Sequence, residues 1–174
     1  MTYYDTISSG YDELHGEEQK RKVRSAKEML RENGVRINKG SLILDVGAGT
    51  GISSDFPCRV ISIDPSVELV AQCQALHMQG IGEALPFKDN MFDLVLCMTA
   101  IHNFSDWKKG IEEMMRVAKD KMIISVLKKS AHFIQISDAL LPYCLAKRDD
   151  PHDEIFLLAA LKKIGSLPVY EHYQ

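Results

Sequence analysis

Apolar residues gather in four short runs, and stretches with helical spacing separate these runs. The runs that we predict to be strands are Leu42–Val46, Val60–Ile63, Phe92–Met98 and Met122–Leu127. Between them, apolar residues recur every three or four positions, which predicts helices over Glu17–Asn33, Ser66–Met78 and Asp106–Ala118. Strands that are apolar on both faces and alternate with helices indicate an α/β fold, a doubly wound and mostly parallel sheet with helices on both faces.

The last third of the chain is less regular. Ala131–Leu145 has helical spacing but contains Pro142, which predicts a break at that residue. Ile155–Ile164 reads as a second helix that is apolar nearly all round, so we expect it to be buried, or to form a substrate cap or a homo-oligomer interface. Gly80–Glu83 is expected to form a short third strand or the end of one. Only Val169–Tyr173 fits a terminal strand, so the sheet is predicted to lack its seventh strand.

Composition is typical of a globular protein with one domain. The 174 residues are 45% hydrophobic and 26% charged. No apolar run approaches ~20 residues, and the first residues are neither basic nor apolar, so we expect no membrane span and no secretion signal. Four cysteines lie far apart without a Cys-x-x-Cys pair, which predicts no metal site and suits a reducing cytoplasm. The net charge of −3 gives no general attraction to nucleic acid.

One stretch joins a predicted strand to three glycines at alternate positions. The strand Leu42–Val46 runs directly into Gly47-Ala48-Gly49-Thr50-Gly51. Glycine lets the backbone turn sharply, and it lets a ligand approach main-chain N–H groups with no Cβ in the way. An ordinary strand-to-helix turn is the alternative, so the residues that follow must decide between the two.

An acidic residue, Asp64, ends the next predicted strand. Ligands of doubly wound sheets bind at the carboxyl ends of the strands, so we expect Asp64 beside the glycine loop, where it can accept hydrogen bonds from both hydroxyls of a ribose. A dinucleotide fold has Gly-x-Gly-x-x-Gly, whereas here the third glycine comes one residue early. No Lys-Ser/Thr follows the glycines, which excludes a phosphate-binding P-loop. The remaining common adenosine ligand is S-adenosylmethionine, which carries no phosphate.

Several segments in register carry a family resemblance. They are Leu44–Gly51, Ile63–Ser66, Gly82–Phe87, Asn90–Val95, Ile101–Phe104 and Met115–Val117. Together they resemble the class I S-adenosylmethionine-dependent methyltransferases, and Leu44–Gly51 looks like motif I of that family. The early Tyr-Asp dipeptides are similar to those of the branch related to the quinone C-methyltransferases. The resemblance covers about residues 3–127 and implies a Rossmann-like fold, which we expect to span residues 1–174 as one domain.

The resemblance implies a role for each residue of the first motif. Gly47 and Gly49 would lie against the methionine portion of the cofactor. Asp45 would reach the cofactor ammonium directly or through a water. The remaining residues expected around the cofactor from this side are Ala48, Gly51, Pro65, Tyr11 and the neighbouring Tyr3 and Tyr4.

The later motifs are expected to hold the adenosine and to border the acceptor. Asp64 would bind the ribose diol, and Glu83 would accept from the adenine amino group, with the Ala84 N–H facing the ring. A solvated loop acid is the alternative for Glu83. Thr99 and His102 would line the pocket beyond the fourth strand. Asp93 is expected to orient the start of that strand instead of touching a ligand.

Methyl transfer from a sulfonium needs little from a protein beyond alignment and a water-poor pocket. A general base is required only when the acceptor must lose a proton, and His102 is the best-placed candidate, with a backbone hydrogen bond as the alternative. The Asn/Asp-Pro-Pro-Tyr/Phe signature of amino-group methylation is absent, because Cys97-Met98-Thr99-Ala100 stands at that place. The sequence therefore predicts an enzyme that releases S-adenosylhomocysteine but names no acceptor.

Three functions remain open at this point. Residues 1–36 are expected to form an N-terminal helical cap and residues 130–153 a substrate-side insertion, which favours a small organic acceptor. A tRNA-modifying methyltransferase with a partner protein is the second reading, because the stretch from Lys20 to Arg36 holds seven basic and two acidic residues. A solvated helix face is the favoured explanation of that run. The third reading is a cofactor-binding regulatory module without catalysis.

Overall fold

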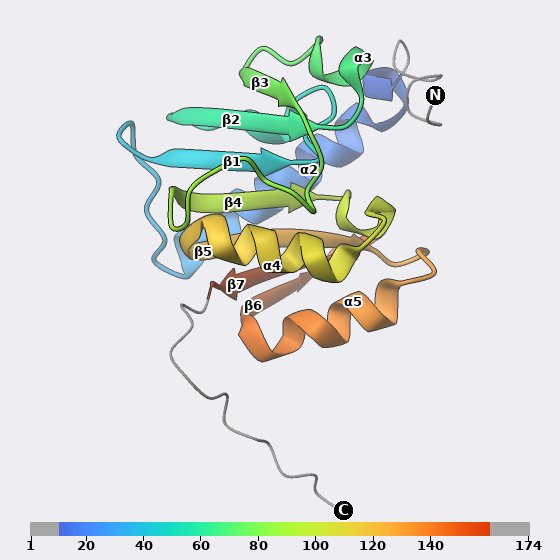
Figure 1. Cartoon of the computed structure of the whole chain (residues 1–174). Helices are drawn as coiled ribbons and strands as arrows, with labels where there is room; N and C mark the ends of the chain where they lie inside the picture. Colours follow the sequence, from blue (N-terminus) through green and yellow to red (C-terminus); the bar gives the residue numbers. More distant parts are fainter. Residues whose placement is uncertain (1–10, 161–174) are drawn as a thin grey trace, which may run out of the picture.

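The computed structural model describes residues 11–160, with side chains from residue 16 onward. A seven-stranded sheet with strand order β3-β2-β1-β4-β5-β7-β6 runs through this part of the chain (Figure 1). Its strands are β1 (Leu42–Val46), β2 (Arg59–Asp64), β3 (Leu76–Gln79), β4 (Phe92–Met98), β5 (Ala118–Leu127), β6 (Cys144–Asp149) and β7 (Asp153–Ala159). The pairs from β3 to β5 are parallel, whereas β7 is antiparallel to both of its neighbours.

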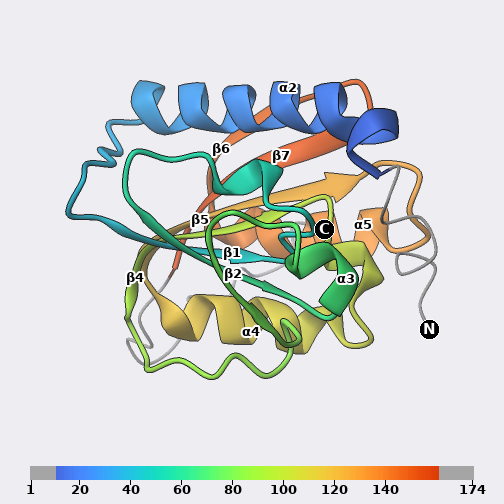
Figure 2. The same ribbon diagram turned by 90° about the horizontal axis from the view of Figure 1, so that it is seen from above.

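Helices cover both faces of the sheet, as the sequence pattern predicts. Figure 2 shows α2 lying along one face and α4 along the other, and α5 lies on the same face as α4 (Figure 1). The helices are α2 (Tyr11–Glu32), α3 (Val67–Val70), α4 (Trp107–Val117) and α5 (Phe133–Leu140), with 3-10 turns η2 (Ile52–Ser54), η3 (Ile101–Asn103) and η4 (Leu141–Tyr143). The doubly wound α/β architecture is confirmed.

The two faces of the sheet carry separate apolar layers. On the α2 face, the helix residues Ala26, Met29 and Leu30 pack over Ile43 and Leu96. The opposite layer is larger and joins α4 and α5 to the sheet through Ile111, Met114, Val117, Ile136 and Leu140. Because strands β1, β4 and β5 contribute to both layers, their near-continuous apolar sequences are explained.

Helix α2 begins at Tyr11, earlier than the predicted Glu17, and it ends at Glu32, just before the predicted glycine stop. Gly34 has a φ of +71°, and its N–H donates to the Arg31 carbonyl at 3.1 Å. The Val35 N–H donates to the Leu30 carbonyl at 2.9 Å. This pair of bonds is a Schellman motif, which needs a left-handed residue at the position of Gly34.

The prediction of a helix at Ile155–Ile164 is wrong. Residues 153–159 form strand β7 between β5 and β6, and Ile155, Phe156, Leu157 and Leu158 are fully buried. A strand buried on both faces is apolar at every position, and periodicity alone does not separate it from a buried helix. Residues 155–160 consequently offer no exposed interface to a second copy, and Val169–Tyr173 lies outside the described residues.

The predicted absence of a seventh strand is also wrong, because β6 and β7 form an antiparallel hairpin at one edge of the sheet. The predicted break at Pro142 is confirmed, since α5 stops at Leu140 and Pro142 stands in the turn η4. Residues 130–153 therefore supply a helix and an edge strand of the main sheet. Their part in acceptor binding stays a prediction.

The prediction of a helix over Ser66–Met78 is only partly right, because the helix is short and residues 76–78 belong to a strand. Helix α3 ends at Val70, and β3 begins at Leu76, just before the expected strand at Gly80–Glu83. Three of the four β3 residues are exposed, since β3 lies at the edge of the sheet, so this strand has no apolar signature.

Candidate cofactor site

A cavity of about 450 Å³ lies at the carboxyl ends of β1, β2 and β4. Strand order reverses between β1 and β4, the position at which doubly wound sheets bind their ligands. The volume is in the range of small-molecule sites. The lining residues from the predicted set are Gly47, Ala48, Gly49, Asp64, Pro65, Glu83 and Thr99. Those of the set that do not line it are Asp45, Gly51, Ala84 and His102.

The three glycines of the loop after β1 all have positive φ, but they serve different needs. A Cβ at Gly47 would lie 2.4 Å from the Ala100 Cβ, so this glycine lets the loop approach the end of β4. A Cβ at Gly51 would lie 2.4 Å from the Cys73 sulfur, which makes Gly51 a packing residue behind the loop. Gly49 has a φ of +55° and a Cβ there would meet no atom within 4 Å. Gly49 thus presents bare backbone to the cavity.

Asp64 locks the loop against the start of α3. Its Oδ2 accepts the Gly49 N–H and its Oδ1 accepts the Ser66 N–H, both at 2.9 Å. The side chain is only 7% exposed, yet it lines the cavity. Because each carboxylate oxygen has two lone pairs, Asp64 can still accept hydrogen bonds from a ligand.

Asp45 lies beneath the glycine loop and is fully buried. Its Oδ2 accepts hydrogen bonds from the Ser53 hydroxyl at 2.6 Å and from the Ser54 hydroxyl at 2.8 Å. Its Oδ1 has no hydrogen-bond partner within residues 11–160. Burial raises the pKa of Asp45 to about 6. A cation at this end of the cavity would favour the ionised form.

Glu83 reaches the cavity from the loop after β3. Its Oε1 accepts the Asp106 N–H at 3.3 Å, next to the start of α4. Ala84 is exposed and lies outside the cavity lining. Glu83 therefore bonds to the start of α4 and also forms part of the cavity wall, whereas Ala84 does neither.

Helix α4 holds the loop that carries Glu83. The Arg116 guanidinium donates to the Leu85 carbonyl at 2.9 Å and to the Phe87 carbonyl at 2.7 Å. Glu113 accepts the Leu85 N–H at 2.9 Å and pairs with the same guanidinium. The predicted segment Met115–Val117 thus contributes Arg116, which holds the loop that carries Glu83. Asp93 accepts the Leu42 N–H at 2.8 Å, so its predicted role at the strand start is confirmed.

The far side of the cavity is formed by the end of β4 and by η3. Thr99 lines it and has a φ of +56°, a conformation rare for a β-branched residue. His102 is half-buried behind the lining, and its buried Nδ1 has no hydrogen-bond partner in the described part of the chain. Burial is the main cause that lowers the pKa of His102, which keeps the imidazole neutral at pH 7.

Sequence reasoning missed part of this wall. Asn103, Phe104 and Ser105 line the cavity from η3 and the turn after it, and Gln19 lines it from α2. The first two lie in the segment Ile101–Phe104 noted above, but nothing in the sequence singles out Gln19. The side chain of Tyr11, and the residues Tyr3 and Tyr4, lie outside what the structure describes.

The basic run of α2 is largely paired within the chain. Ion pairs join Lys20 to Glu17, Arg21 to Asp150, Lys22 to Glu18 and Asp153, and Lys27 to Asp55. Four of the seven basic residues thus meet carboxylates of the same chain. Within residues 11–160 no group of three or more His, Cys, Asp or Glu side chains is placed to hold a metal ion. Over the same residues, no helix has the length and apolar content needed to cross a membrane.

Comparison with known proteins gives the same domain. The methyltransferase domain family matches residues 44–126. An uncharacterised methyltransferase, YcgJ of Bacillus subtilis, is 34% identical over a match that covers 44% of this chain and 36% of that protein. A demethylmenaquinone methyltransferase of Renibacterium salmoninarum is 36% identical, with 46% of this chain and 38% of that protein covered. The chain spans less than half the length of these relatives.

A solved structure extends the likeness to the fold. The magnesium protoporphyrin IX methyltransferase of Synechocystis, solved with bound S-adenosylmethionine, superposes with a TM-score of 0.65 and 18% identity. The match covers 80% of this chain and 78% of that one. The domain match and the relatives show a methyltransferase domain over residues 44–126, and the superposition shows that this chain shares the fold of the solved structure.

Proposed function

We propose that the chain binds S-adenosylmethionine in this cavity and transfers its methyl group to a small-molecule acceptor, leaving S-adenosylhomocysteine. The observation that carries the proposal is the glycine loop fixed by Asp64 at the sheet reversal, with the unpartnered Asp45 oxygen beneath it. A loop that offers backbone and carboxylates, without a basic residue in the cavity lining of the described chain, suits a cationic ligand free of phosphate.

The residues present fit the parts of this cofactor. Gly47 and Gly49 give open backbone for the methionine portion, and the Asp45 Oδ1 favours its ammonium through the loop. Asp64 supplies acceptors for the ribose hydroxyls, and Glu83 supplies one for the adenine amino group. Ala48 and Pro65 complete the wall, and Gly51 packs behind the loop against Cys73. When bound, the cofactor supplies an electrophilic methyl group on a sulfonium.

The chain contributes orientation and proton handling to the transfer. Thr99, Asn103, Phe104 and Gln19 border the space left for an acceptor. For an acceptor that must lose a proton, we propose His102 as the base, acting directly or through one water, since its imidazole is neutral and its Nδ1 is without a partner in the described chain.

The small-molecule acceptor is favoured over RNA by the pairing of the basic residues on α2. Lys22 is buried, and Lys20, Arg21 and Lys27 already meet carboxylates, so fewer than half of the seven basic residues have no ion pair within the described chain that would compete with phosphates. A tRNA-modifying activity would need a partner protein that supplies further positive charge for binding the RNA.

The test is a transfer assay with methyl-labelled S-adenosylmethionine on fractionated cell extract. The proposal predicts label in the small-molecule fraction, removed when Asp64 is replaced by alanine. Label in the RNA fraction, with binding that weakens steeply with salt, would support the RNA reading instead. Tight cofactor binding without labelled product in any fraction would favour the regulatory module.

A further inference from the structure

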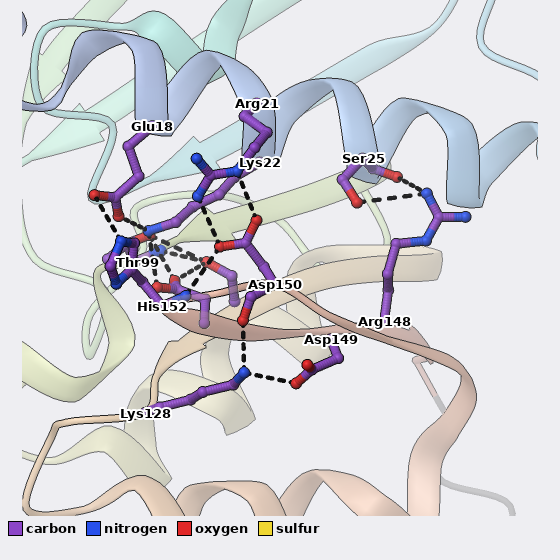
Figure 3. Close-up of polar contacts among 12 residues, drawn as sticks. Glu18, Arg21, Lys22, Ser25, Thr99, Lys128, Arg148, Asp149, Asp150 and His152 are labelled. Carbon is purple, nitrogen blue, oxygen red and sulfur yellow. Dashed lines mark hydrogen bonds and ion pairs between the residues drawn. The ribbon is translucent and has the colours of Figure 1, made fainter.

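A lysine of α2 is fully buried behind the cavity wall. The Lys22 ammonium has three oxygens close to it: Glu18 Oε1 at 2.6 Å, Asp153 Oδ1 at 2.8 Å and Thr99 Oγ1 at 3.1 Å (Figure 3). Asp153 is fully buried as well, and Glu18 is partly exposed. A buried lysine is rare unless it is paired, so each of these contacts helps to keep the charge in the interior.

The contacts of Lys22 continue into the sheet. The Thr99 hydroxyl donates to Asp153 Oδ2 at 2.8 Å, and the Ser125 hydroxyl donates to the same oxygen at 2.9 Å. The Thr99 N–H donates to the Ser125 hydroxyl at 2.7 Å. We call Lys22, Thr99, Ser125 and Asp153 the Lys22 cluster. Its members come from α2, the end of β4, β5 and the start of β7.

The Lys22 cluster is not explained by the stability that it adds to the fold. A buried ion pair is often no more stabilising than apolar residues of the same volume. Thr99 in addition holds a left-handed backbone conformation, with a φ of +56°, which is strained for a β-branched residue. Such a network fixes the geometry of its members, because several partners hold each of them.

The elements that the Lys22 cluster joins contribute to the cavity wall at two points. Thr99 is itself a lining residue, and its hydroxyl is occupied within the cluster. Gln19, which lies three residues before Lys22 and so on a neighbouring part of the helix surface, lines the cavity from α2. Fixing Lys22 therefore fixes both the β4 end and the α2 side of the wall.

We propose that Lys22 is a positioning residue of the methyl-transfer site: through Thr99, Ser125 and Asp153 it holds α2 and the end of β4 in the arrangement that binds cofactor and acceptor. This inference rests on the proposed function. It assigns the middle of α2 a place in the site, although Lys22 itself is not among the lining residues.

The neighbouring residue offers a matched control. Arg21 bonds to Asp150 through two nitrogens, at 3.0 and 3.1 Å, and so also ties α2 to the β6–β7 hairpin. Arg21 is 42% exposed on its side chain, and neither Arg21 nor Asp150 lines the cavity. Removing this pair weakens the attachment of α2 without touching the wall.

The experiment compares two double variants. The first, called the Lys22 pair, combines Lys22→Met with Asp153→Asn, and the control, called the Arg21 pair, combines Arg21→Met with Asp150→Asn. Both partners are replaced because Lys22→Met alone would leave Asp153 charged and unpaired in the core. Circular-dichroism melts select a temperature at which both are folded. Calorimetry with S-adenosylhomocysteine is expected to show about tenfold weaker binding for the Lys22 pair and a change of less than about twofold for the control. Equal affinities in the two pairs would overturn the proposal.

A third variant, Thr99→Gly, keeps the experiment decisive if the Lys22 pair does not fold. Glycine accepts the φ of +56° without strain and removes the whole Thr99 side chain together with its hydroxyl contacts to Lys22 and Asp153, so this variant should fold and lose affinity by at least a similar factor. Affinity equal to that of the wild type would again contradict the proposal.

Binding by the wild type is judged separately. A folded wild-type chain that binds no S-adenosylhomocysteine would contradict the proposed function. Hydrogen exchange then decides about the cluster: the amides of residues 99–103 are expected to exchange faster in the Lys22 pair than in the Arg21 pair, and equal rates would refute the coupling of α2 to this wall.

Discussion

On the β1–β2 side of the cavity, the wall is made of glycine backbone and of a carboxylate that faces the open space. On the β4–β5 side, the polar groups of Thr99, Ser125 and Asp153 are bonded to one another and to Lys22. On the first side, Asp64 fixes the glycine loop and also lines the cavity, whereas on the second side the polar side chains bond mainly to one another. We infer that the first side recognises the cofactor and the second side sets where an acceptor can lie.

The largest effect is expected on the first side, from Asp64→Ala. The change removes the ribose acceptors and frees the Gly49 N–H, so affinity for S-adenosylhomocysteine should fall by about 100-fold or more. Calorimetry measures the affinity, and a melting curve checks the fold. Asp55→Ala is the control, because Asp55 is an exposed carboxylate whose ion pair with Lys27 lies outside the cavity. Asp64→Ala with wild-type affinity would refute the ribose assignment.

His102→Gln tests the second side. For an acceptor that loses a proton, turnover should drop by about 100-fold while the affinity for S-adenosylhomocysteine stays the same, because the ring lies outside the cavity lining. Since burial lowers the pKa of His102, protonation of this group should not change wild-type turnover around pH 7, and turnover should fall only in more acidic solution. Unchanged turnover in the variant, together with an unchanged pH profile, would remove His102 from the reaction.

Substitutions at two glycines of the same loop are expected to affect stability and cofactor binding differently. Gly47→Ala brings a Cβ within 2.4 Å of Ala100 at a φ of +70°, and it should lower the free energy of unfolding by about 2–5 kcal/mol. Gly49→Ala meets no neighbour, so it should cost only about 1–2 kcal/mol but weaken cofactor binding. Urea unfolding and calorimetry on both variants check this. A larger loss of stability in Gly49→Ala than in Gly47→Ala would contradict the packing described here.

The last prediction concerns the pH dependence of stability that Asp45 causes. Its pKa is raised in the folded chain from 3.8 to about 6, so the folded state holds an extra proton between these values. Stability should therefore decrease as pH rises from about 4 to 6, by no more than about 3 kcal/mol, and stay lower above that window. Asp45→Asn should remove this slope in urea unfolding of the ligand-free chain. A variant that keeps the wild-type slope would show that another group causes it.

The sequence predicts the first side of the cavity well and the second side poorly. Gly47, Gly49 and Asp64 lie in short local motifs at strand ends, and the parallel sheet brings such ends together, so their proximity follows from the pattern. Lys22, Ser125 and Asp153 are far apart in the chain and belong to three elements. Each looks like an ordinary polar residue until the fold places it, and the prediction of a helix at residues 155–164 hid β7, where Asp153 stands.

The fold shows the same division between clear and ambiguous patterns. Strands β1, β4 and β5 carry long apolar runs and were predictable, as was the helix that ends at Gly34. Edge strand β3 is mostly exposed and β7 is buried on both faces, so neither has the alternating pattern that separates strands from helices.

The most direct test of the account is a calorimetric titration of the wild-type chain with S-adenosylhomocysteine and, separately, with a nicotinamide dinucleotide of similar size. The account predicts one-site binding of S-adenosylhomocysteine and none of the dinucleotide, because the glycine loop carries the methyltransferase spacing and no cationic side chain lines the described cavity. Binding of the dinucleotide, or no binding of S-adenosylhomocysteine by a folded chain, would contradict it.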